Sequence, residues 1–131
     1  MIQRIQTLYL FGAAIISTLG AFILPLYATE SEVFRATAGM YTFLTFGISM
    51  SLFSGAVLLY RNRKMQLVVV RLGMLSALAA MGFIVQAILA NAGAEARWGA
   101  AAPFICILFA FLAAKGIQKD EKKVRSLDRL R

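Results

Sequence analysis

Residues 7–27 read TLYLFGAAIISTLGAFILPLY and carry no charged side chain. A helix rises about 1.5 Å per residue, so about 20 consecutive apolar residues cross the roughly 30 Å hydrocarbon core of a bilayer. The stretch therefore predicts a membrane-spanning helix over residues 7–27. Pro25 lies near its end, where the loss of a backbone N–H donor costs least.

Three further apolar runs follow, at 38–60, 67–90 and 99–115. None alternates apolar and polar residues as the strands of a membrane barrel do. Within lipid, only a helix satisfies its own backbone polar groups in a single segment. We therefore expect an all-α membrane protein with four transmembrane helices in one domain, residues 1–131. The connections are short, so consecutive helices are expected to be antiparallel neighbours.

The overall composition agrees with this prediction. Hydrophobic residues make up 60% of the chain and charged residues 15%, against about 45–50% and 25% in soluble domains. The net charge is +8 and there is no histidine. Because the cations cluster at the ends of the apolar runs, we expect anionic lipid headgroups as the partner rather than nucleic acid.

The distribution of Lys and Arg predicts the orientation in the membrane. The outer connections hold only Arg35 and Arg97, whereas the termini, the 61–66 connection and the adjoining inner ends of the spans hold twelve cations. Such a bias places both termini in the cytoplasm. The twelve are Arg4, Arg61, Arg63, Lys64, Arg71, Lys115, Lys119, Lys122, Lys123, Arg125, Arg129 and Arg131.

The predicted spans lack the groups that catalysis and proton-coupled transport use. No Asp, Glu, Lys or His lies in the middle of a span, where pumps and transporters carry ionisable residues. Without histidine, the commonest base that would activate a serine is missing. Cys106, the single cysteine, lies in an apolar run and is expected to be a small hydrophobe. We therefore expect no enzyme activity, no metal and no cofactor.

Three features within the spans are candidate contacts. Arg71, one turn inside its span, is expected to reach the phosphate headgroups, with a helix or a bound lipid as the alternative. Gln86 is expected to hydrogen-bond another helix of the same chain, with a partner subunit as the alternative. Gly47, Ser51 and Gly55 share one helix face, which we expect to pack inside the bundle, with an oligomer contact as the weaker alternative.

The last residues, 116–131, read GIQKDEKKVRSLDRLR and are too charged to enter the membrane. Ile117, Val124 and Leu127 form a narrow apolar stripe, and Glu121 can pair with Arg125 four residues on. We predict a short, basic, amphipathic helix lying at the cytoplasmic surface. Its expected role is lipid anchoring, with docking of a cytoplasmic or membrane partner as the alternative.

Two stretches go beyond a general membrane pattern: MIQRIQTLYL at 1–10 and KDEKKVRSLDRLR at 119–131. With Asn62-Arg63-Lys64, Gln66 and Arg71, they resemble the bacterial family called domain of unknown function 4293, over nearly the whole chain. The resemblance implies a small four-helix protein of the inner membrane of Gram-negative bacteria. It implies no activity and no catalytic or ligand residue. Members often have Ala-Asp where this chain has Leu127-Asp128, which adds apolar surface to the tail.

These polar segments form one basic cytoplasmic face if they assemble together. We therefore expect a non-enzymatic accessory or scaffold subunit of an inner-membrane assembly, with its protein partner docked on that face. The alternative is a small oligomeric transporter or lipid-handling protein, with hydroxyls of the second span and Gln86 lining a path. The candidate lipid- or partner-contacting residues are Arg4, Arg61, Arg63, Lys64, Arg71, Lys119, Lys122, Lys123 and Arg125.

Overall fold

The computed structural model describes residues 2–91 and 93–129, without the side chains of residues 2–4 and 128. Four long helices dominate this part of the chain: α1 (Ile2–Phe22), α2 (Met40–Leu58), α3 (Arg63–Ala90) and α4 (Ala102–Arg129). Each is long and apolar enough to cross a membrane, judged by length and composition. The prediction of four long apolar helices is thereby confirmed.

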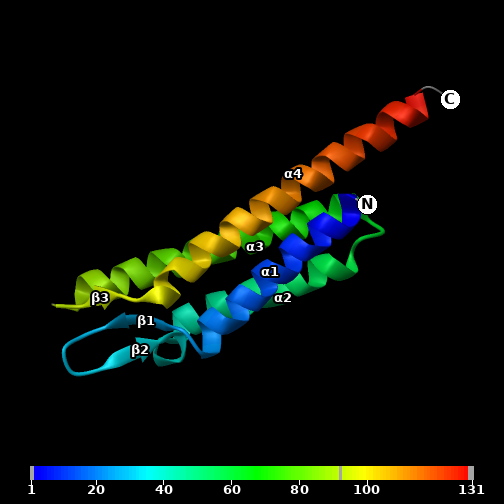
Figure 1. Cartoon of the computed structure of the whole chain (residues 1–131). Helices are drawn as coiled ribbons and strands as arrows, with labels where there is room; N and C mark the ends of the chain where they lie inside the picture. Colours follow the sequence, from blue (N-terminus) through cyan, green and yellow to red (C-terminus); the bar gives the residue numbers. More distant parts are fainter. Residues whose placement is uncertain (1, 92, 130–131) are drawn as a thin grey trace.

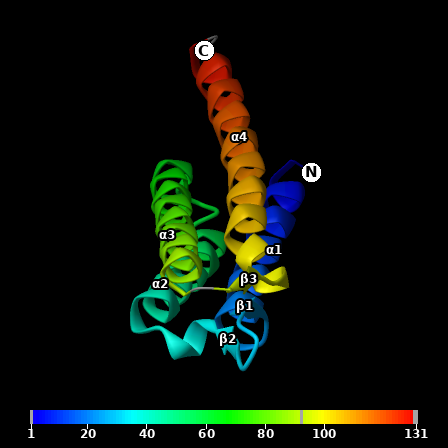
Figure 2. The same ribbon diagram turned by 90° about the vertical axis from the view of Figure 1, so that its left-hand side faces the viewer.

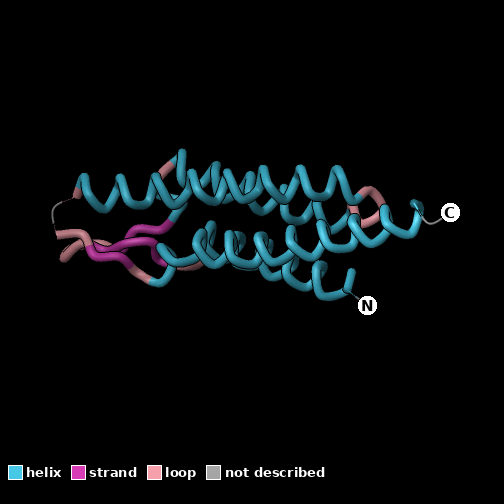
Figure 3. The backbone as a smooth tube through the Cα atoms, turned by 90° about the horizontal axis from the view of Figure 1, so that it is seen from above, coloured by secondary structure: helices cyan, strands magenta, loops and turns pink. Residues whose placement is uncertain are grey.

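The helices run up and down, and each packs against two neighbours (Figures 1 and 2). α1 and α3 both contact α2 and α4, so the bundle closes in the order α1–α2–α3–α4. One end of the bundle holds residues 2–6, 59–66 and 116–129, and we call it the basic end. The opposite end, formed by residues 23–39 and 93–101, is called the sheet end (Figure 3).

α1 ends at Phe22, so the predicted helix over 7–27 is too long at its C-terminal end. Proline has no N–H to donate and disfavours helical geometry at the preceding residue, which is Leu24. The chain instead forms β1 (Pro25–Ala28), which pairs with β2 (Val33–Arg35) and β3 (Glu95–Ala96). The end of the first predicted span and the two short connections at 28–37 and 91–98 thus build an antiparallel sheet in the order β2-β1-β3.

The sheet is held to the bundle by a close backbone approach. Short 3-10 turns, η1 (Ala36–Ala38) and η2 (Trp98–Ala101), lead into α2 and α4. The backbone N–H of Arg97 donates to the oxygen of Leu26 at 3.0 Å. A Cβ on Gly99 would lie 2.6 Å from the oxygen of Pro25, so only glycine lets η2 lie this close to β1.

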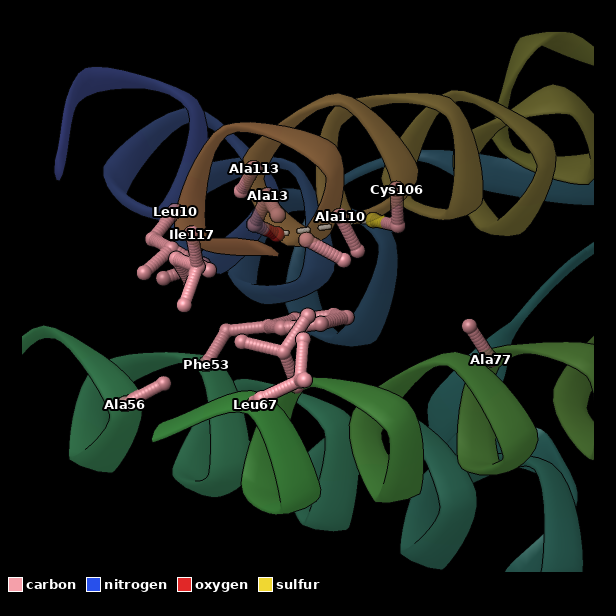
Figure 4. Packing of buried hydrophobic residues seen from close by; sticks show 13 residues of the cluster. Leu10, Ala13, Phe53, Ala56, Leu67, Ala77, Cys106, Ala110, Ala113 and Ile117 are labelled. Carbon is pink, nitrogen blue, oxygen red and sulfur yellow. Dashed lines mark hydrogen bonds between the residues drawn. The ribbon is translucent and has the colours of Figure 1, made fainter. Parts of the chain in front are cut away.

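The core is built from two buried phenylalanines of α2, each seated over a glycine of a neighbouring helix. A Cβ on Gly73 of α3 would lie 2.6 Å from Cε1 of Phe53. A Cβ on Gly20 of α1 would lie 2.7 Å from Cε1 of Phe46. Both rings are almost completely buried, and Figure 4 shows Phe53 in the centre of its cluster. Small residues therefore set how closely α2 approaches α1 and α3.

α1 and α4 pack through alanine and other small side chains. Ala13, Ala110 and Ala113 are completely buried between them (Figure 4). Cys106 is a free, buried cysteine whose Sγ lies 3.4 Å from the oxygen of Ala13 and 3.2 Å from Oγ of Ser17. It thus fills the interior as a small side chain, as its position in an apolar run predicts.

α4 runs unbroken from Ala102 to Arg129, so residues 116–129 continue the fourth helix, and its end extends beyond the other three (Figures 1 and 2). This corrects the prediction of a short helix lying along the surface, since no break separates the tail from the span. Ile117 is completely buried in the core, so interior packing continues past the predicted span end at residue 115. We call residues 118–129 the α4 extension.

The structure corrects two expectations about helix packing. Gly47 and Gly55 would have open space around an added Cβ, and Ser51 is exposed. This face of α2 therefore points outward, while the inner contact is made by the face that carries Phe46 and Phe53. The side chain of Gln86 is also exposed and makes no hydrogen bond within the part of the chain that the structure describes.

Candidate site at the basic end

A buried polar contact ties the start of α1 to the base of the α4 extension. Gln6 Nε2 donates to Oδ2 of Asp120 at 2.9 Å, and both side chains are more than nine-tenths buried. A Cβ on Gly116 would lie 2.8 Å from this Gln6 nitrogen. A glycine one turn before Asp120 therefore leaves room for the amide. Loss of either side chain would leave the other buried without a hydrogen-bond partner, which is costly in folding free energy.

A second buried amide anchors the turn between α2 and α3. Gln66 Nε2 donates to the oxygen of Ala56, near the end of α2, at 2.9 Å. Asn62 caps α3 through its Oδ1, which accepts from the backbone N–H of Met65 at 3.3 Å. Such caps satisfy a free donor of the first turn, so α3 begins at Arg63, one turn before the predicted 67.

These contacts place the α2–α3 turn beside the α4 extension, with a groove of about 760 Å³ between them. Arg61 lies over the ring of Tyr60, 5.7 Å from its centroid, and its Nε lies 3.2 Å from the Tyr60 hydroxyl. On the facing wall, Arg125 pairs with Glu121 at 2.9 Å. The groove is lined by Tyr60, Arg61, Asn62, Arg63, Lys64, Glu121, Val124 and Arg125.

The groove carries a positive charge that its own residues do not neutralise. Four cations and one carboxylate line it, and the carboxylate of Glu121 is already paired with Arg125. Within the described residues, Arg63 and Lys64 have no ion-pair or hydrogen-bond partner on their side chains. Both belong to the first turn of α3, whose free N–H groups and positive dipole end also attract anions. The arrangement favours an anionic ligand.

The structure brings some of the predicted site residues together and separates others. Arg61, Arg63, Lys64 and Arg125 share the groove, and Lys122 lines a smaller hollow beside it. Arg71 is exposed two turns further along α3. The exposed side chains of two other predicted residues, Lys119 and Lys123, line neither space. The side chain of Arg4 lies outside what the structure describes.

Sequence reasoning missed the groove itself and its uncharged walls. Tyr60 and Val124 line it, although they read in the sequence as an interface aromatic and part of an apolar stripe. Gln6 and Asp120, which hold the two elements together, are polar residues beside apolar runs within the family-like end segments. Their position in those segments was the one feature of the sequence that pointed to a structural role for Gln6 and Asp120.

The interior offers no set of groups for chemistry within the described residues. No three His, Cys, Asp or Glu residues there lie close enough to hold a metal ion. The buried polar side-chain atoms that the structure describes all have hydrogen-bond partners. The polar groups that remain available are therefore those of the basic end and of the outward surface.

The fold and the site together define a small protein of four apolar helices with a basic groove at one end. The chain belongs to the family Domain of unknown function (DUF4293), whose model matches residues 2–130. This confirms the family that the end segments resemble. No curated protein and no solved structure matches the chain.

Proposed function

We propose that the chain is a multi-pass protein of the bacterial inner membrane with its basic end in the cytoplasm. Its role there is that of a non-enzymatic accessory or scaffold subunit. The outward surfaces of the helices support membrane insertion, because large apolar side chains are exposed on each. Leu8 is 69% exposed, Leu75 is 62% exposed and Leu89 is 81% exposed. Lipid would remove that apolar surface from water.

The charge at the two ends supports this orientation. The basic end carries the cations of the groove and of the α4 extension, whereas the sheet end carries Arg35 and Arg97 with three glutamates. Positive charge is retained on the cytoplasmic side of inner-membrane proteins. Trp98 at the sheet end and Tyr60 at the basic end are both exposed, as the interface aromatics of a membrane protein are.

The α4 extension is the observation that carries the scaffold role. Its far end projects beyond the other three helices (Figures 1 and 2), and it exposes Val124 and Leu127 together with Lys119 and Lys123. The Gln6–Asp120 contact fixes its base to α1. A helix with exposed cations and two exposed apolar side chains is suited to docking an acidic protein surface.

The side chains inside the bundle give less support to the alternative function, that of a transporter. Two of the α2 hydroxyls expected to line a path are bound to backbone oxygens of their own helix instead. Ser49 Oγ donates to the oxygen of Thr45 at 2.9 Å, and Thr45 Oγ1 donates to the oxygen of Thr42 at 2.9 Å. Gln86 faces outward, and Phe46 and Phe53 fill the space between the helices. A packed interior with an outward small-residue face favours the scaffold role.

Purification from the native membrane tests this proposal. The tagged protein is extracted in mild detergent, and co-purifying proteins are identified and quantified by mass spectrometry. We expect a stoichiometric partner that the Lys119→Glu/Lys123→Glu variant loses by about tenfold or more. The Arg63→Glu/Lys64→Glu variant, which makes the same change of charge inside the groove, serves as the matched control and keeps the partner.

Two results would contradict the scaffold proposal. One is a homo-oligomer that carries no other protein in stoichiometric amount. The other is equal partner loss in both variants, because the α4 extension would then not be the docking element. Either result would direct the next experiments to ligand and lipid transport.

A further inference from the structure

One outward seam between α3 and α4 joins the basic groove to the apolar middle of the bundle. Leu67, Arg71, Met74 and Leu78 are spaced four, three and four residues apart, which places them on one face of α3. Next to the groove lies a hollow of about 250 Å³, lined by Leu67, Gln118, Glu121, Lys122 and Arg125. Further along lies a hollow of about 350 Å³, lined by Arg71, Met74, Leu75, Leu78 and Ile107.

The chemistry of this seam changes along its length. The part of the seam next to the groove is cationic, and its Arg63 and Lys64 have no partner in the described part of the chain. The part toward the middle of the bundle is apolar and is formed by Met74, Leu78 and Ile107. Arg71 lies between the two parts, and side chains on a helix lean toward its N-terminus. Arg71 is exposed and itself lines the apolar hollow, so it supplies a cation at the edge of the apolar part of the seam.

We propose that the α3–α4 seam binds one anionic phospholipid. Its phosphate lies between Arg71 and the unpartnered pair Arg63 and Lys64, and one acyl chain lies along Met74 and Leu78. The inference rests on the membrane placement proposed above and names a lipid for the same end of the molecule. The cationic-to-apolar order over about 22 Å of helix matches an amphiphile. An acidic peptide or free phosphate would match only the cationic part of the seam.

The walls of the site are fixed before any lipid binds. Asn62 caps the start of α3, and Gln66 holds the turn to α2. The Glu121–Arg125 pair orders the facing side of α4. A preorganised site loses less side-chain freedom on binding, so we expect selective, stoichiometric binding rather than exchange with any neighbouring headgroup.

Native mass spectrometry of the full-length protein tests the headgroup part. The protein is reconstituted in nanodiscs of phosphatidylcholine with a minor share of phosphatidylglycerol, then released for counting of bound lipid. We expect one retained phosphatidylglycerol in the wild type and about tenfold less in Arg63→Gln/Arg71→Gln. The control variant, Lys119→Gln/Lys123→Gln, loses the same charge outside the seam and retains the lipid within twofold.

A second pair of variants tests the acyl-chain part. Leu78→Trp fills the apolar hollow, whereas Leu72→Trp adds the same bulk to an exposed position of α3 outside it. We expect only Leu78→Trp to reduce retained phosphatidylglycerol. Helix content and thermal unfolding are measured for every variant, so that a folding defect is recognised as such.

Several outcomes would overturn the inference. Equal loss in the two charge variants would mean diffuse attraction to the whole basic end. Equal loss in the two tryptophan variants would mean no acyl-chain site. Displacement of the lipid by inorganic phosphate or by a polyglutamate peptide at equal concentration would identify a soluble anion or an acidic protein as the ligand. Membranes that contain the same variants are also washed at alkaline pH. A variant that stays in the membrane is still inserted, so its loss of lipid is not due to failure of the proposed membrane placement.

Discussion

Two glycines and two phenylalanines determine how closely three of the helices pack. Phe53 occupies the space that a side chain on Gly73 would need, and Phe46 does the same over Gly20. Interiors are packed as densely as organic crystals, so neither ring has free volume into which to move. The glycines that were expected to make such contacts, Gly47 and Gly55, lie in open space instead.

Gly73→Ala should destabilise the bundle by about 1–3 kcal/mol, because its methyl group would overlap the buried Phe53 ring. Gly55→Ala is the matched control, since its methyl group meets open space and alanine is the better helix former. Unfolding of both variants in mixed detergent, followed by circular dichroism, measures the difference. Equal stability of the two variants would show that Phe53 does not pack against Gly73.

The contact between Gln6 and Asp120 should be worth more than a surface hydrogen bond. Asp120→Ala leaves the buried amide of Gln6 without its partner, which costs about 1–3 kcal/mol. The double variant Gln6→Ala/Asp120→Ala should be less destabilised than the sum of the two single variants. A double-mutant cycle of unfolding free energies measures this coupling. Strict additivity would contradict the contact.

At the scale of elements, the main difference from the sequence-based prediction is that α4 is one continuous helix. A helix lying on the surface requires a bend near Gly116, where the predicted span ends. The structure keeps this residue helical because Ile117 continues the core and Asp120 binds Gln6. The end of the polar tail therefore projects past the bundle (Figure 1), where it can reach a partner.

Distance measurements between spin labels should find α4 straight. Labels at Leu108→Cys and Leu127→Cys, in a Cys106→Ala background, would be joined by about 28 Å of uninterrupted helix. Both positions are exposed, so the labels should not disturb the core. A right-angle bend at Gly116 would shorten the backbone separation of the two labelled positions to about 20 Å. Pulsed electron paramagnetic resonance measures the distance between the labels and distinguishes the straight helix from the bent one. Unlabelled Cys106→Ala protein serves as the folding control.

At the scale of the whole molecule, the bundle has one basic end and one end closed by a sheet. The sheet lies at the end of the bundle opposite the two termini (Figure 3), with Glu30 and Glu32 between β1 and β2 and Glu95 in β3. In an inner membrane, this separation of charge would hold the molecule in a single orientation.

Labelling with a membrane-impermeant thiol reagent should confirm that orientation. In spheroplasts with a Cys106→Ala background, Glu32→Cys should react and Lys123→Cys should react only after the membrane is opened. The physical reason is the retention of Lys and Arg on the cytoplasmic side. The opposite labelling pattern, or labelling of both sites before opening, would contradict the proposed topology.

The number of helices and their order along the chain were determined by the sequence alone. Each follows from local composition, because an uncharged run of about 20 residues has few structural alternatives. Arg61, Arg63, Lys64 and Arg125 were among nine residues named from their positions beside the apolar runs, but local composition did not single them out. Local composition did not reveal the end of α1, because strand pairing of Pro25–Ala28 depends on two distant segments.

Only the tertiary structure decided which helix faces point inward and how the basic end is built. In apolar helices both the core and the outer surface are apolar, so periodicity does not separate the Gly47 face from the Phe53 face. The groove exists because Gln6 meets Asp120 across 114 residues of chain and because α4 continues past residue 115. Contacts over such separations depend on how the helices pack, which no local pattern in the sequence encodes.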